Sequence, residues 1–236
     1  MAGWVEGAAG PGGPALALVY LELALALTLL PTVLHFRRLR ETRDELGAVR
    51  IYFLAVFGLL LLLPGLLVVA TAARPLEALT AFGWTFGRVG LGAALTLGGL
   101  PLAILAGFIG SGDPALQKMY PFAKAAGADR RTFAGYELSY VVLYYLPWES
   151  VFRGVLFLPL IPSIGLVPAL AVQTIISTLL HIGHPDSEVF AAACAGLAFG
   201  LMAYFTGSFF YPLVLHASTG VATDTFLFLR RRKAGR

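Results

Sequence analysis

Charged residues are scarce in this sequence. They make up 13% of the 236 residues, against about 25% in an ordinary soluble domain, whereas apolar residues make up 58% against roughly 45–50%. The mean hydropathy is correspondingly high, at +0.80. This composition excludes an ordinary soluble domain and predicts an integral membrane protein.

Two further features are missing. The sequence has a single cysteine, Cys194, which excludes a disulfide within the chain and any metal site built from cysteines. The apolar runs also lack the alternation of apolar and polar residues that is typical of an outer-membrane barrel. Several of these runs reach the roughly 20 residues that a helix needs to cross a bilayer, so the predicted fold is an all-α, polytopic transmembrane helix bundle.

Breaks between the apolar runs divide the chain into about seven candidate spans and leave no room for a soluble domain. We therefore predict one integral membrane domain over residues 1–236. The long connection 111–135 mixes basic and aromatic residues, and we expect a short amphipathic segment there. The seven predicted spans are 14–36, 51–72, 88–110, 136–160, 164–182, 188–205 and 208–229.

Basic residues predict the orientation of the chain. Most of the 17 Lys and Arg residues fall in 37–50, 118–131 and 230–236, after the first, third and seventh predicted spans, so all three segments lie on one side of the membrane. By the positive-inside rule that side is the cytoplasm, so we expect the N-terminus outside and the C-terminus inside. The net charge of +4 therefore reflects topology, and no nucleic-acid partner is expected.

A stripe of small residues runs along the sixth predicted span. Ala192, Gly196 and Gly200 are spaced four apart and so share one helical face. Small side chains at this spacing allow the backbone of a neighbouring helix to approach closely. We predict that this helix lies in the interior of the bundle.

Ionisable residues nevertheless occur in the last four spans. A charged side chain in the hydrocarbon core costs at least about 2.5 kcal/mol, so such residues normally face a polar interior. We expect these residues to share one buried, polar cavity. They are Glu149, Arg153, His181, His216 and Asp224, with His184 and Glu188 in the adjoining loop and helix start.

Each of these residues also has a purely structural interpretation. Glu149 and Arg153 are four residues apart and could form an ion pair that only joins helices. His181 could cap the end of its helix, while His216 could bond a neighbouring carbonyl. Asp224 follows His216 by eight residues and shares its face. Taken together, a carboxylate, an arginine and two histidines on different helices suit hydrolysis by an activated water.

Three motifs carry a resemblance to a known family. They are the stretch "WESVFRG" at 148–154, a histidine that closes the next span (His181), and "LHAS" at 215–218. In this order they resemble the CAAX-protease and bacteriocin-processing (CPBP, or ABI) intramembrane proteases, which include the type II CAAX prenyl endopeptidases. The resemblance covers about residues 136–228. It implies a catalytic core of membrane helices in a bacterial plasma membrane.

The family motifs are EExxxR, FxxxH and HxxxN, and this sequence departs from each. Trp148 replaces the first glutamate, which in the family is held to activate water, and Gly220 replaces the asparagine. The resemblance carries over Glu149, Arg153, His181 and His216, with Glu188 and Asp224 as supporting residues. Glu149 then either takes over as the base, with Arg153 as its countercharge, or the fold serves without catalysis. A divalent metal such as Zn²⁺ is a further option, held by Glu149, His181 and His216.

The function predicted from these residues is an intramembrane endopeptidase, with a membrane-associated peptide or membrane protein as substrate and the lipid bilayer as its environment. Its alternative is a non-catalytic membrane scaffold or binding protein of the same fold, which the tryptophan at 148 motivates. A proton relay that uses Glu22 of the first span ranks lowest, because no inverted repeat supports a transporter.

Overall fold

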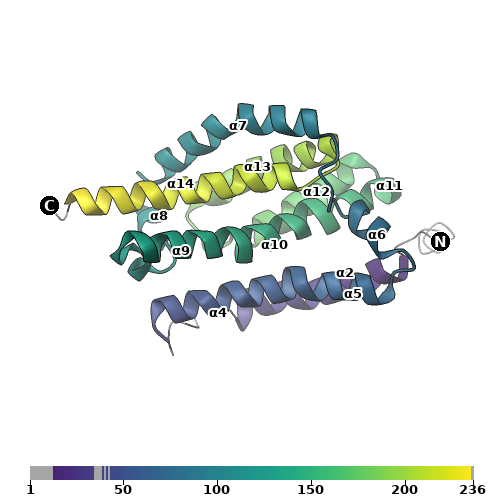
Figure 1. Ribbon diagram of the computed structural model, residues 1–236, viewed down its shortest axis with the longest axis horizontal. Coiled ribbons are helices and arrows are strands. Elements are labelled where there is room, and N and C mark those ends of the chain that lie inside the picture. Colours follow the sequence, from purple (N-terminus) through teal and green to yellow (C-terminus); the bar gives the residue numbers. More distant parts are fainter. Residues whose placement is uncertain (1–12, 35–38, 40, 42, 235–236) are drawn as a thin grey trace.

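A computed structural model describes residues 13–34, 39, 41 and 43–234 of the chain. Helices dominate these residues, and the part of the chain that is described contains no β-strand beyond one isolated bridge between Ile182 and His184. The predicted all-α bundle is therefore confirmed. Figure 1 shows the longer helices running nearly parallel to one long axis.

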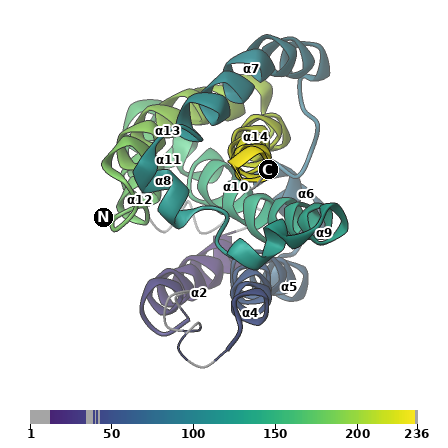
Figure 2. The ribbon, with the colours of Figure 1, turned by 90° about the vertical axis from the view of Figure 1, so that its left-hand side faces the viewer.

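The N-terminal part forms an outer layer of the bundle. It comprises α2 (Gly13–Thr32) and a continuous rod of α4 (Glu45–Phe57), the π-helical turn η1 (Gly58–Leu62) and α5 (Leu63–Thr71). The short helix α6 (Pro75–Ala81) follows. In the end-on view of Figure 2, α2, α4 and α5 lie together on one side of the molecule.

A second rod occupies the middle of the bundle and carries the motif "WESVFRG". It consists of α9 (Arg130–Tyr140), the π-helical turn η3 (Val141–Tyr145), α10 (Leu146–Glu149) and the π-helical turn η4 (Ser150–Val155). Proline has no N–H and its ring collides with the carbonyl one turn earlier, so an α-helix cannot continue undisturbed through Pro147. The π turn η3 ends directly before α10, with the N–H of Leu146 bonded to the carbonyl of Val141.

The remaining helices cover the other side of this rod, as Figures 1 and 2 show. Short elements connect them, and α7 pairs with α14 while α12 pairs with α13. The elements are α7 (Val89–Gly110), α8 (Pro114–Met119), the 3₁₀ turn η2 (Lys124–Ala128), the 3₁₀ turn η5 (Leu158–Leu160), α11 (Ile161–Ile164), α12 (Leu166–Leu179), α13 (Asp186–Thr206) and α14 (Phe210–Ala234).

Aromatic packing joins the outer layer to the middle rod. Phe53 of α4 is fully buried and stacks on Tyr140 of α9, with 5.0 Å between ring centroids and 8° between ring planes. Phe122 packs against both rings. The connection 111–135 contributes to this cluster, since Phe122, Ala123 and Ala126 are buried in it. That this connection is an amphipathic segment in the membrane interface stays a prediction.

Five helices among the described residues are long and apolar enough to cross a membrane. Large apolar side chains are exposed along them, including Leu21, Leu97 and Ile109, as expected where lipid is the solvent. The protein is an integral membrane protein. Helices also form at the other two predicted spans, as α12 and α14. However, α12 is shorter than these five helices, and α14 is not among the five. The five are Ala15–Thr32, Glu45–Thr71, Val89–Gly110, Arg130–Ile164 and Asp186–Thr206.

The basic segments gather at one end of the bundle. Figure 1 shows the start of α4, the helix α8, the start of α9 and the C-terminal end of α14 at the same (left) end. Of the residues used to predict the orientation, Arg37, Arg38, Arg40 and Arg236 lie outside the described residues. The predicted orientation of the termini stays a prediction.

The small-residue stripe lies at a helix seam. Gly196 and Gly200 are buried against α12, and a Cβ added at Gly200 would lie 2.8 Å from Nε2 of Gln173. The same Gln173 amide donates to the carbonyl of Gly196 at 2.8 Å. Close backbone approach at these glycines therefore allows Gln173 of α12 to donate a buried hydrogen bond to α13, as the spacing predicted. The prediction that this helix lies in the interior is wrong, because Phe190, Leu197 and Phe205 along it are exposed.

Candidate active site

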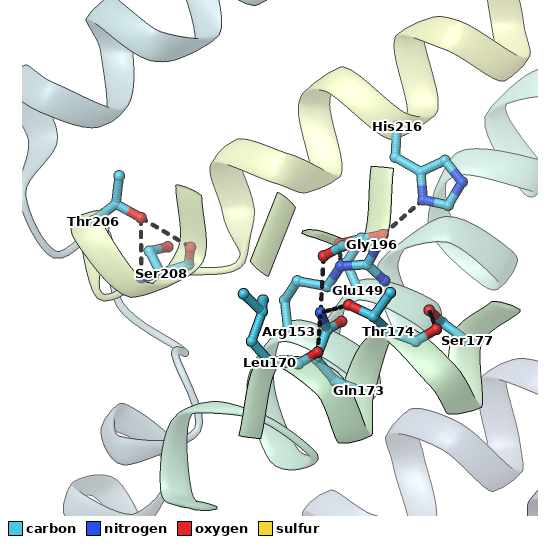
Figure 3. A network of polar contacts seen from close by, with 10 residues as sticks. All are labelled: Glu149, Arg153, Leu170, Gln173, Thr174, Ser177, Gly196, Thr206, Ser208 and His216. Atoms are coloured by element: carbon cyan, nitrogen blue, oxygen red, sulfur yellow. Dashed lines mark hydrogen bonds and ion pairs between the residues drawn. The ribbon is translucent and has the colours of Figure 1, made fainter. Parts of the chain in front are cut away.

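Glu149 lies at the centre of a buried ionic network. Its Oε1 accepts a hydrogen bond of 2.6 Å from Nδ1–H of His216, on α14. Its Oε2 lies 3.3 Å from Nε of Arg153, one turn further along the same rod. The predicted ion pair is thus present, and Figure 3 shows His216 reaching the carboxylate from the neighbouring helix.

This network is almost completely excluded from solvent. The Glu149 side chain is 0% exposed and that of Arg153 is 3% exposed. The Arg153 guanidinium also lies over the ring of Phe199, 5.6 Å from its centroid. Glu149 Oε2 and Arg153 Nε make no geometrically good hydrogen bond within the described chain, so their attraction is mainly ionic. Such a pair depends on both partners, because a lone charge at this depth is costly.

His181 is fixed by the end of its own helix. Its Nδ1–H donates to the carbonyl of Ser177 at 2.7 Å. One turn earlier in α12, the Gln173 side chain anchors this helix to α13 through its hydrogen bond to the carbonyl of Gly196. Figure 3 shows Gln173, Thr174 and Ser177 along this face of α12. Because a carbonyl can only accept, His181 carries its proton on Nδ1 when neutral, and its Nε2 is left with a lone pair.

Trp148 faces His181 rather than Glu149. The indole stacks on Tyr144 at 5.6 Å and 15°, and it meets the His181 ring edge-on at 5.6 Å and 84°. Successive helical residues point about 100° apart, which is why Trp148 and its neighbour Glu149 contact different helices. The residue that replaces the first motif glutamate is therefore a buried aromatic wall beside His181.

A second polar cluster forms where α13 begins. Oε1 of Glu188 accepts two hydrogen bonds, from the Tyr120 hydroxyl at 2.6 Å and from Nδ1–H of His184 at 2.9 Å. Burial and the neighbouring Glu188 carboxylate hold the pKa of the Tyr120 hydroxyl well above its usual value, so it remains a donor. The His184 ring lies 5.4 Å from that of His181.

One cavity of about 450 Å³ brings most of the predicted residues together. His181, His216, Glu188 and Asp224 all line it. Its other walls are apolar surfaces of α7 and α13. Glu149 and Arg153 do not line this cavity but lie behind His216. Further lining residues are Ala106, Ile109, Gly110, Leu116, Ala191, Ala192, Ala195 and Phe199.

The Tyr145 hydroxyl lies against Gly220, where this sequence lacks the motif asparagine. A Cβ added at Gly220 would collide with the Tyr145 hydroxyl, so no larger side chain fits there without movement. The Tyr145 ring also meets the His216 ring edge-on, with 4.7 Å between centroids. A phenol from the middle rod therefore lines the cavity where the family motif places an asparagine from α14.

Asp224 is buried at the cavity wall opposite a second acid, Glu137 of α9. The two carboxyl groups interact electrostatically, and their exposed fractions are 1% for Asp224 and 7% for Glu137. Two carboxylates so close cannot both be ionised cheaply, which favours a shared proton. The shared face of His216 and Asp224 expected from their spacing is present, since both line the cavity.

Several cavity residues were not singled out by the sequence analysis. Asp113, Tyr120 and Tyr140 come from the connection 111–135 and from α9, which the motifs do not cover. Glu137 of α9 does not line the cavity but interacts with Asp224, which does. Tyrosine and acidic residues in a segment between membrane spans are common at the membrane–water interface, so their presence there did not indicate a functional site. Only Glu137, an acid inside a predicted span, carried a usable signal.

The predicted metal ligands do not form a metal site. Within the described ranges, no group of three or more His, Cys, Asp or Glu side chains could hold an ion. Oε1 of Glu149 is occupied by the Nδ1–H of His216, so these two groups face each other rather than a common point. The donor set does not fit a zinc ion.

Residues 133–222 match the family model described as "Type II CAAX prenyl endopeptidase Rce1-like". The resemblance to the CAAX proteases is confirmed over this segment. The Rce1-like match contains Trp148, Glu149, Arg153, His181, Glu188 and His216 and ends just before Asp224. No curated protein and no solved structure matches the chain.

Proposed function

We propose that this chain is an intramembrane endopeptidase that hydrolyses a peptide bond of a membrane-associated substrate. The observation that carries the proposal is the arrangement of two imidazoles. His181 and His216 come from different helices, line one cavity, and both have Nδ1 bonded to an acceptor. The Rce1-like match supports the same class of reaction.

The hydrogen bonds at Nδ1 determine which chemical role the other ring nitrogen, Nε2, of each imidazole can take. In both rings the second nitrogen, Nε2, is free to act on a group in the cavity, as a base when neutral and as a donor when protonated. Since the Glu149 carboxylate lies at Nδ1 of His216, it stabilises that ring when the ring is protonated. His216 therefore suits the donor role, to the oxyanion and to the leaving amine, while His181 suits holding the attacking water.

Glu149 and Arg153 act through His216 in this proposal. Glu149 is fully buried behind the imidazole and does not line the cavity, which supports a positioning role for its carboxylate. Arg153 supplies the countercharge at 3.3 Å. The role of Glu149 as the water-activating base stays a prediction from the sequence.

The cavity indicates the class of substrate. Its lining includes Asp113 and Leu116, and α8, which contains Leu116, lies at the end of the bundle where the basic segments gather. We take this end as the cytoplasmic one. Its apolar walls, formed by α7 and α13, suit a substrate that carries a covalently attached lipid group. A prenylated peptide, the substrate class in the family's description, has this character.

Replacement of His216 by Gln tests the proposal. The assay uses the full chain in liposomes and a fluorogenic peptide with a prenylated cysteine near its C-terminus. We expect cleavage by the wild-type chain and a loss of roughly 10²–10⁴-fold in His216→Gln, as for removal of a general acid. A wild-type chain that binds but never cleaves would overturn the proposal in favour of a scaffold.

A further inference from the structure

The two carboxylate oxygens of Glu188 have different surroundings. Oε1 is held by two donors, the Tyr120 hydroxyl and Nδ1–H of His184. Oε2 is also shielded from bulk solvent, yet no group among the described residues donates to it. Because Glu188 lines the cavity, the carboxylate is clamped through one oxygen and has its other oxygen available to a molecule inside.

Both Trp148 and Glu188 lie near His181. The indole meets the His181 ring edge-on from α10, and the Glu188 carboxylate lies near enough to interact electrostatically with that ring from the start of α13. Trp148 offers no acceptor to a water beside His181, whereas Glu188 offers a carboxylate there from the start of α13.

We propose that Glu188 is the catalytic base that replaces the acid missing at position 148. This assignment rests on the proposed peptidase function and names a residue for one of its steps. The clamp by Tyr120 and His184 fixes the carboxylate while it gains and loses a proton, so the group need not reorganise during the reaction.

Hydrolysis of the peptide bond by this base needs water as its only co-reactant. Oε2 of Glu188 removes a proton from water, whose oxygen forms a bond to the peptide carbonyl carbon, and the carbonyl electron pair moves to its oxygen. That pair then re-forms the carbonyl while the C–N bond breaks. The departing nitrogen takes a proton from Nε2 of protonated His216, which gives a free amine and a new carboxyl end. Transfer of the proton on Glu188 to His216 then restores both residues.

Several titratable groups surround Glu188 and will shape its pH response. Those that interact with it come from the connection after α8, the middle rod, the loop before α13 and α14. They are Tyr120, Tyr144, Tyr145, His181, His184 and Asp224.

Glu188→Gln tests the assignment. Glutamine keeps an oxygen that can accept from Tyr120 and His184 but cannot take a proton from water. In liposomes with a prenylated fluorogenic peptide, we expect a fall in kcat of about 10²–10⁴-fold and loss of the acid limb of the pH profile. The matched control is Glu77→Gln, which changes an exposed acid paired only with Arg74 and should cleave as the wild type does.

The possible results separate this assignment from the proposed function. Glu188→Gln with wild-type kcat and pH profile overturns the role of Glu188 and leaves the peptidase intact, whereas an inert wild-type chain overturns both. If the Gln variant melts early, Glu188→Asp provides the second test. It keeps a carboxylate, so we expect a reduced rate with the acid limb retained, and a flat pH profile would overturn the assignment.

Discussion

Replacement of Glu149 by Gln should destabilise the protein strongly. The substitution keeps an oxygen that can accept from His216 but removes the negative charge 3.3 Å from Arg153. The guanidinium is then 3% exposed and has no anion beside it. Breaking a buried pair in this way costs about 3–5 kcal/mol in the free energy of unfolding.

The measurement is thermal unfolding in detergent micelles, followed by tryptophan fluorescence. The control is Glu77→Gln, since the Arg74–Glu77 pair is more than half exposed on both sides and should contribute no more than about 1 kcal/mol. The double variant Glu149→Gln/Arg153→Met removes both charges and should recover most of the loss. If Glu149→Gln melts at the temperature of the Glu77 control, the buried ionic network described here is wrong.

Three further predictions concern single positions. Trp148→Phe should retain cleavage, because this residue serves only as an aromatic wall, and a loss of more than tenfold in the peptide assay would argue for a direct role. Gly220→Ala should lower the free energy of unfolding by about 1–3 kcal/mol, because the new methyl group meets the Tyr145 hydroxyl. The control Gly98→Ala has open space at its Cβ and should not lower the free energy of unfolding. Equal melting temperatures of the two variants would contradict this prediction. Asp129 caps α9, and hydrogen bonds from Thr132 lower the pKa of its carboxyl group in the folded protein. The ionised carboxylate therefore stabilises the folded protein at pH values above the pKa that Asp129 has in the unfolded chain. This stabilisation is lost as the pH falls through the lower pKa of the folded protein. Asp129→Ala should therefore melt earlier than the wild type at neutral pH but not at strongly acidic pH, as melting curves across pH will check.

The overall bundle could be predicted because bilayer thickness fixes the length of an apolar helix. Each predicted span corresponds to a helical segment, and the spacing of Glu149 and Arg153 gave their ion pair. The eight-residue spacing of His216 and Asp224 likewise placed both on one cavity wall. These features are local, so helical periodicity alone is sufficient for them.

The unpredicted features depend on contacts between distant segments. The Tyr120–Glu188 bond joins residues 68 positions apart, and the folding of the connection 111–135 into the aromatic cluster brings it about. Which of Trp148 and Glu149 contacts His181 and which contacts His216 also depends on the rotation of α10, which follows a π-helical turn. Periodicity of 3.6 residues does not reveal a π turn, and Pro147 was the only local sign of one.

The most direct test of the central claim, that this helix bundle encloses a hydrolytic site, is mass spectrometry of cleavage in oxygen-18 water. The full-length chain in liposomes is incubated with a prenylated CAAX peptide, and the products are analysed. We predict a single new carboxyl terminus that carries one oxygen-18 atom, and no such product with His216→Gln. A peptide that stays intact with the wild-type chain, or equal labelling with both chains, would contradict the account.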